Sequence, residues 1–88
     1  MKALIIEDER DQAEATGSGL KKLGYSVVIA KDGAGGMKRA LSEGYDLIIV
    51  DLRLPDMDGR DIIRAVREKH IDTTIIIISC FTDEATKV

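Results

Sequence analysis

Residues 47–50 are Leu-Ile-Ile-Val, an uninterrupted apolar run that leads directly into Asp51 and then into a turn rich in Pro, Asp and Gly. Such a run, without polar alternation, is typical of a strand that is buried on both faces, as the strands of parallel sheets are. Asp51 would then lie at the carboxyl end of its strand, where open α/β sheets bind their ligands. A carboxylate in that position is costly unless it is solvated, paired or bound to a metal. The stretch therefore predicts a parallel α/β sheet with a polar site at this strand end.

The remainder of the chain alternates between apolar runs and segments with helical spacing. The runs predict strands at residues 3–6, 25–30, 46–50 and 73–79, and the spacing predicts helices at about 11–23, 34–43 and 58–70, with another beginning near residue 82. This alternation favours one α/β domain with a parallel sheet, helices on both faces and right-handed crossovers.

The first predicted helix is weak. Gly17 and Gly19 lie inside it, and each costs about 1 kcal/mol relative to alanine. Asp8 or Asp11 would cap its start, and Gly24 would end it. Its apolar face is thin and consists of Ala13, Ala15, Leu20 and Leu23.

Composition excludes several classes of protein. The 88 residues are 44% apolar and 33% charged, the balance of an ordinary globular domain. A net charge of −3 and the lack of a Lys/Arg run argue against a nucleic-acid surface. The single cysteine, Cys80, excludes an internal disulfide and suits a reducing cytoplasm. Apolar runs such as residues 75–78 are far too short to span a bilayer, so no membrane partner is expected.

Acidic residues follow two of the predicted strands. Glu7 and Asp8 come after the first strand and Asp51 after the third, so neighbouring strands would bring them together. Carboxylates in contact repel, which requires either a proton or a cation between them. Mg²⁺ binds carboxylate oxygens, and the main-chain carbonyl of Arg53 could add a further ligand. With its charge neutralised in this way, Asp51 could attack phosphorus and form an aspartyl phosphate.

A simpler interpretation is that these acids only cap helices and solvate loops, and for any one acid it is the better one. The combination with Asp51 at a strand end favours a site. Ser79 ends the fourth predicted strand as Asp51 ends the third, and its hydroxyl could donate a hydrogen bond to a phosphoryl oxygen. Taken alone, a serine at a strand end is more often a turn former.

Over essentially all 88 residues, the sequence resembles the receiver domain of two-component response regulators. The resemblance rests on Glu7-Asp8 after an apolar run, Gly24-Tyr25 before the second strand, residues 51–59, and Ser79-Cys80 after the fourth strand. It implies a flavodoxin-like, doubly wound parallel sheet of order 2-1-3-4-5. Residues 1–88 would form an incomplete receiver domain of order 2-1-3-4, lacking the fifth strand and the last helix.

The resemblance also implies a role for each site residue. Asp51 would be the phosphoacceptor, taking a phosphoryl group from a histidine kinase or phosphotransfer protein. Asp8, Asp51 and the Arg53 carbonyl would hold Mg²⁺, with Glu7 acting directly or through water. Ser79 would be the switch hydroxyl. Such a domain is a signalling module rather than an enzyme, at most phosphorylating and dephosphorylating itself, and its output is carried by other segments.

The sequence departs from the family pattern near Val88. The fifth-strand lysine that pairs with the phosphoacceptor is not among the 88 residues, and Lys87 is not its equivalent. We therefore expect phosphorylation of this 88-residue form to be impaired. We also expect the Ile-rich fourth strand, residues 74–79, to be an unpaired sheet edge through which the chain forms a dimer or higher oligomer.

Two alternatives belong to other classes of protein. One is a non-signalling, receiver-like interaction module that assembles through the same edge. The other is a metal-dependent nuclease or primase-type domain, which would require a second acid two residues after Asp51, where this chain has Arg53.

Overall fold

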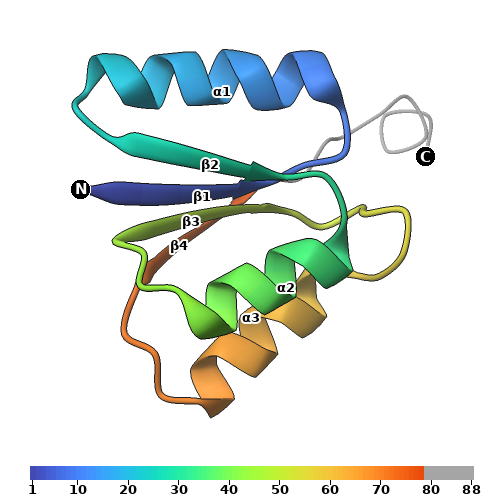
Figure 1. The fold of residues 1–88 in the computed structure, drawn as a ribbon. Coiled ribbons are helices and arrows are strands. Elements are labelled where there is room, and N and C mark those ends of the chain that lie inside the picture. The colour runs from blue at the N-terminus through green and yellow to red at the C-terminus, as the bar shows by residue number, and fades with distance from the viewer. Residues whose placement is uncertain (79–88) are drawn as a thin grey trace.

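The structure is a computed structural model, and it describes residues 1–78 (Figure 1). Its elements are β1 (Lys2–Ile6), α1 (Arg10–Lys22), β2 (Ser26–Ala30), α2 (Gly33–Ser42), β3 (Leu47–Asp51), α3 (Gly59–Glu68) and β4 (Thr74–Ile78). The predicted helix near residue 82 and the predicted site residue Ser79 lie outside the described residues.

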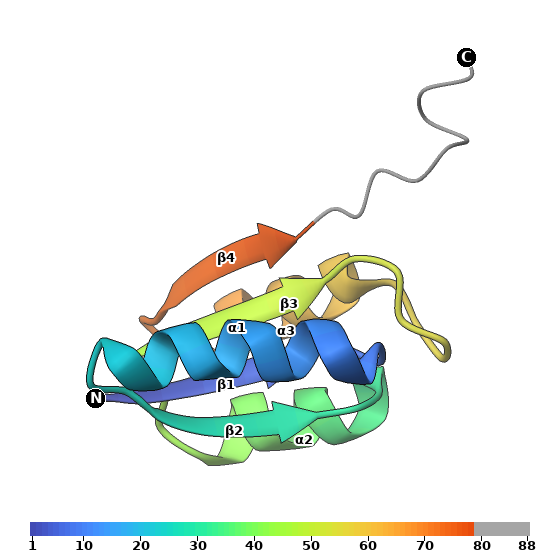
Figure 2. The ribbon, with the colours of Figure 1, turned by 90° about the horizontal axis from the view of Figure 1, so that it is seen from above.

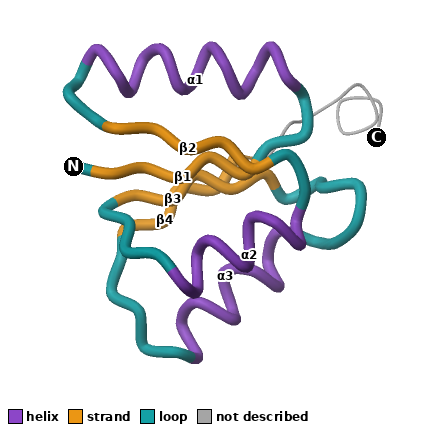
Figure 3. Tube along the Cα trace, viewed as in Figure 1, coloured by secondary structure: helices purple, strands orange, loops and turns teal. Residues whose placement is uncertain are grey.

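The strands form one parallel sheet in the order β2-β1-β3-β4, as predicted (Figure 2). Helix α1 covers one face, and α2 and α3 cover the other (Figures 1 and 3). Within residues 1–78, this is the flavodoxin-like, doubly wound arrangement with its first four strands. The register places Ile6 at the end of β1 opposite Val50 of β3, so the chain leaves both strands at the same edge of the sheet.

The two central strands explain the unbroken apolar runs in the sequence. All five residues of β3 are buried, and so are four of the five residues of β1. Their side chains alternate between two clusters, as the period of a strand requires. The cluster on the α2/α3 side contains Leu4, Ile6, Ala30, Ala40, Tyr45, Ile48, Val50, Leu54, Ile62 and Val66, and the cluster on the α1 side contains Ala3, Ile5, Ala13, Leu47 and Ile49.

The start of α1 differs from the prediction. Its N-cap is Glu9, whose carboxylate accepts hydrogen bonds from the backbone N–H groups of Asp11 at 3.2 Å and Gln12 at 2.9 Å. The predicted caps were wrong because Asp8 lies outside the helix, beside other carboxylates, and Asp11 is already in the first turn. The helix does end where predicted, with Gly24 in the left-handed region at φ +97°.

The face that α1 turns to the sheet also differs from the prediction. Ala13 and Gly17 are buried and Leu20 is half-buried, a row at helical spacing. The predicted Ala15 lies off this row and is exposed, and Leu23 is the C-cap, 76% exposed. A glycine at position 17 therefore contributes to the sheet-facing surface.

Helix α2 approaches the sheet closely through Gly36. A Cβ added there would lie 2.6 Å from Cγ2 of Ile6, and the Ile6 side chain is completely buried. Because Ile6 is the last residue of β1, the first turns of α2 lie directly against the strand end from which Glu7 and Asp8 emerge.

We expect Gly36→Ala to destabilise the fold by about 1–3 kcal/mol, because the new methyl group has no room beside the buried Ile6. The matched control is Gly19→Ala in α1, where nothing lies within 4 Å of an added Cβ and where alanine should stabilise the helix by about 0.5–1 kcal/mol. Urea unfolding of both variants measures the difference. A shift of both variants in the same direction would contradict the packing described for α2.

Candidate functional site

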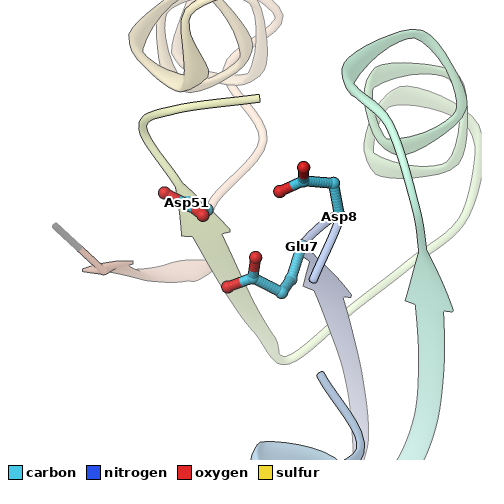
Figure 4. Close-up of side chains that lie close together, drawn as sticks. All are labelled: Glu7, Asp8 and Asp51. Atoms are coloured by element: carbon cyan, nitrogen blue, oxygen red, sulfur yellow. The ribbon is translucent and has the colours of Figure 1, made fainter. Parts of the chain in front are cut away.

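The parallel pairing of β1 and β3 brings three acids together at the carboxyl edge of the sheet (Figure 4). Glu7 and Asp8 directly follow β1, and Asp51 is the last residue of β3. Each offers a carboxylate oxygen, and these oxygens all lie within 4.8 Å of one another. The convergence predicted from the sequence is therefore present, and it joins residues that are more than forty positions apart.

The three acids differ in burial. Glu7 is 3% exposed and Asp51 is 5% exposed, whereas Asp8 is open to solvent. One oxygen of Glu7, Oε2, accepts a hydrogen bond from the N–H of Glu9 at 3.0 Å. The other, Oε1, is buried and has no hydrogen-bond partner in the described part of the chain. Asp51 Oδ1 accepts a hydrogen bond from the N–H of Arg53 at 3.0 Å.

This environment changes the acidity of Glu7. Burial raises its pKa from 4.5 to about 7, the N–H of Glu9 opposes that rise, and the carboxylates of Asp51 and Asp8 add to it. Near pH 7 the Glu7 carboxyl is therefore protonated in part of the molecules, and a cation bound by the cluster would displace that proton.

The residues fit a hard divalent cation such as Mg²⁺, which binds oxygen ligands and needs only one or two carboxylates from a protein. A cation between Glu7, Asp8 and Asp51 would give the unpartnered Oε1 of Glu7 a positive neighbour and remove the mutual repulsion. The fourth predicted ligand, Arg53, lies two residues after Asp51, in the loop between β3 and α3. The contribution of its carbonyl stays a prediction.

The β3–α3 loop is closed tightly at its base. Arg53 and Asp58 form an isolated antiparallel bridge, and the N–H of Gly59 donates to the carbonyl of Leu52 at 3.0 Å. A Cβ at Gly59 would lie 2.4 Å from the main-chain oxygen of Asp51, so only glycine allows this approach. Asp58 caps α3 by accepting from the N–H of Arg60 at 2.9 Å.

From the sequence, Asp56 is expected only as part of the turn that follows Asp51. In the structure its carboxylate accepts hydrogen bonds from the N–H groups of Gly33 at 2.7 Å and Ala34 at 2.9 Å, at the start of α2. These two bonds lower the pKa of Asp56 below its usual range. The sequence indicates that a helix begins near residues 32–34, and such a start has free N–H groups that an acid could bind. No local pattern links that segment to a loop more than twenty residues later, so the contact itself is not indicated.

A doubly wound parallel sheet with an acidic cluster at the end of its first and third strands defines a class of protein, and comparison with known proteins gives the same class. Residues 3–88 match the family described as the response regulator receiver domain. The chain belongs to this family.

Relatives of known sequence are response regulators. The chain is 45% identical over 85 residues to response regulator ArlR of Staphylococcus haemolyticus and 38% identical over 88 residues to transcriptional regulatory protein DltR of Streptococcus agalactiae. The matches include 97% and 100% of this chain, but only 38% and 39% of the relatives. The chain thus spans about two fifths of the length of these proteins.

Solved receiver structures have the same fold. Response regulator TrrA of Thermotoga maritima, in complex with Mg²⁺ and BeF, is 26% identical with a TM-score of 0.85, over 99% of this chain and 76% of that one. A response regulator of Burkholderia pseudomallei with a phosphorylated aspartic acid and a calcium ion is 26% identical with a TM-score of 0.83. The match covers 98% of this chain and 54% of that one. Within residues 1–78 of the present chain, no helix is long and apolar enough to cross a membrane.

The raised pKa of Glu7 predicts how stability depends on pH when divalent cations are chelated. Between pH 4.5 and about 7 the folded chain binds the Glu7 proton more tightly than the unfolded chain, so this residue's contribution to stability is lost as pH rises through that window. Glu7→Gln mimics the protonated side chain. We expect it to match the wild type below pH 4.5 and to exceed it by on the order of 2 kcal/mol above pH 7.

Urea unfolding of the two proteins at a series of pH values, in the presence of a chelator, measures this difference. A constant difference across the range, or a Glu7→Gln protein that is less stable than the wild type at pH 8, would contradict the assignment.

Proposed function

We propose that this chain accepts a phosphoryl group on Asp51 from a histidine kinase or a phosphotransfer protein, with Mg²⁺ as the cofactor. The observation that carries the proposal is the position of Asp51, at the end of β3 and within 4.8 Å of the carboxylates of Glu7 and Asp8. The membership of the family supports it, and so do the two solved neighbours, one with Mg²⁺ and BeF and one with a phosphorylated aspartic acid.

The residues that would hold Mg²⁺ are Glu7, Asp8, Asp51 and, through its main-chain carbonyl, Arg53. When bound, the ion would neutralise the acidic cluster and attract the oxygens of the incoming phosphoryl group. Asp8 is the solvent-exposed member and would meet an ion that arrives from solution, whereas the buried Glu7 and Asp51 form the floor of the site.

In the proposed reaction, a carboxylate oxygen of Asp51 attacks the phosphorus of a phosphohistidine. A new P–O bond forms while the P–N bond breaks, its electron pair stays on the imidazole nitrogen, and that nitrogen takes up a proton. The N–H of Arg53 holds Oδ1 of Asp51 at 3.0 Å and so orients the carboxylate. Self-phosphorylation from small phosphodonors and self-dephosphorylation would use the same oxygens. The proposed hydroxyl donor, Ser79, lies outside the described residues.

We place this exchange in the cytoplasm, on the argument that a chain with a single cysteine suits a reducing compartment. DNA binding and other output in a longer regulator would be properties of other segments. The alternative is a non-signalling interaction module. It is the weaker proposal, because it does not explain why two carboxylates are buried at the sheet edge.

The test uses acetyl phosphate and MgCl₂ with intact-mass detection. We expect a mass increase of one phosphoryl group that disappears with Asp51→Asn or with a chelator, and that persists with Asp61→Asn, an exposed acid of α3 whose partner is Arg64. Because the 88 residues do not include the family's fifth-strand lysine, we expect the yield to be low. Labelling that persists in Asp51→Asn would refute Asp51 as the acceptor.

Self-association through β4 is a separate proposal. Ile76 and Ile77 of this strand are 47% and 50% exposed, and β4 lies at one edge of the sheet in residues 1–78. We expect the 88-residue chain to sediment as a dimer or larger species at micromolar concentration, and Ile76→Lys to shift it towards the monomer, because a charge opposes strand pairing at an edge. A compact wild-type monomer at that concentration would refute the proposal.

A further inference from the structure

The tip of the β3–α3 loop is fastened to a helix that precedes it by more than twenty residues. Asp56 accepts from both Gly33 and Ala34, and the side chain of Met57 lies against Gly33. A Cβ at Gly33 would lie 2.2 Å from Cγ of Met57, so the loop and the helix are in close contact there. Two charge-assisted hydrogen bonds and this packing join the loop to the start of α2.

Helix α2 does not need Asp56 as a cap of its own. Asp32 already serves as the local N-cap by accepting from the N–H of Gly35 at 2.7 Å. The bonds from Asp56 satisfy two further N–H groups of the first turn, and their acceptor is a side chain of the β3–α3 loop. Their particular effect is therefore to fix the loop in place.

The same turn of α2 also lies against the other half of the acidic site. Gly36 packs on Ile6, the residue immediately before Glu7. The start of α2 thus contacts the end of β1 through Gly36 and the loop that follows Asp51 through Asp56. One turn of helix therefore contacts both the residue before Glu7 and the loop that follows Asp51.

We propose that Asp56 is a positioning residue, which ties the loop after Asp51 to the start of α2 and so sets the placement of Asp51 and Arg53 relative to Glu7 and Asp8. The expected change in Mg²⁺ binding rests on the proposed function, whereas the expected change in the loop does not. Arg53 lies at one end of this loop, in the bridge with Asp58, so a loop that is no longer tied to α2 would carry Arg53 and the residues around it to new positions.

The test compares Asp56→Ala with Asp32→Ala in the 88-residue chain. Both variants remove one negative charge and at least one hydrogen bond to an N–H group in the first turn of α2, but only Asp56→Ala removes the contact with the β3–α3 loop. Backbone amide NMR without divalent ions should show Asp56→Ala shifting the signals of residues 52–54, which Asp32→Ala leaves near their wild-type positions. A titration with MgCl₂ should then give Mg²⁺ binding about tenfold weaker for Asp56→Ala than for Asp32→Ala.

Asp56→Asn is the conservative variant. It keeps one acceptor oxygen, so its loop signals should lie between those of the wild type and Asp56→Ala. Equal changes in Asp56→Ala and Asp32→Ala, or loop signals that Asp56→Ala leaves unchanged, would overturn the positioning role. If the wild type binds no Mg²⁺, the proposed function fails, and the amide signals alone decide the role of Asp56.

Discussion

Three carboxylates meet at one edge of the sheet, and the fold has to hold them together against their mutual repulsion. Two of them, Glu7 and Asp51, are almost completely buried, and Glu7 keeps an oxygen without a hydrogen-bond partner in residues 1–78. A fold selected only for stability would replace such a group with an apolar side chain, since buried, unsatisfied charge costs free energy. The cation that we propose for this cluster would explain why the acids are kept there.

The surrounding elements hold the acids in place despite this repulsion. In the parallel register of β1 and β3, Ile6 pairs with Val50, so the acids that follow these two residues lie side by side. Gly59 lets α3 begin directly against the carbonyl of Asp51, and Gly36 lets α2 lie on the end of β1. A site that must gather like charges needs such rigid support, and the two close backbone approaches supply it.

Much of this arrangement could be predicted from the sequence, because it follows from local patterns. Short apolar runs gave the strands, and acids after the first and third strands gave the cluster. The N-cap of α1 was predicted wrongly because several acids follow one another at residues 7–9, and the sequence does not say which of them faces the helix. The direction in which the chain leaves β1 decides that Glu9 caps α1 and that Glu7 is buried. The contact of Asp56 with α2 could not be predicted, since it joins segments with no shared periodicity.

The environment of Glu7 disfavours its charged form, and we propose that a bound cation relieves this. Carboxyl ¹³C NMR of Glu7 as a function of pH, recorded without and with MgCl₂, measures this. Without divalent ions we predict that Glu7 titrates with a pKa of about 7, and that saturating Mg²⁺ moves its titration to lower pH. A Glu7 signal that titrates near 4.5 without Mg²⁺, or that is unaffected by the ion, would contradict the account.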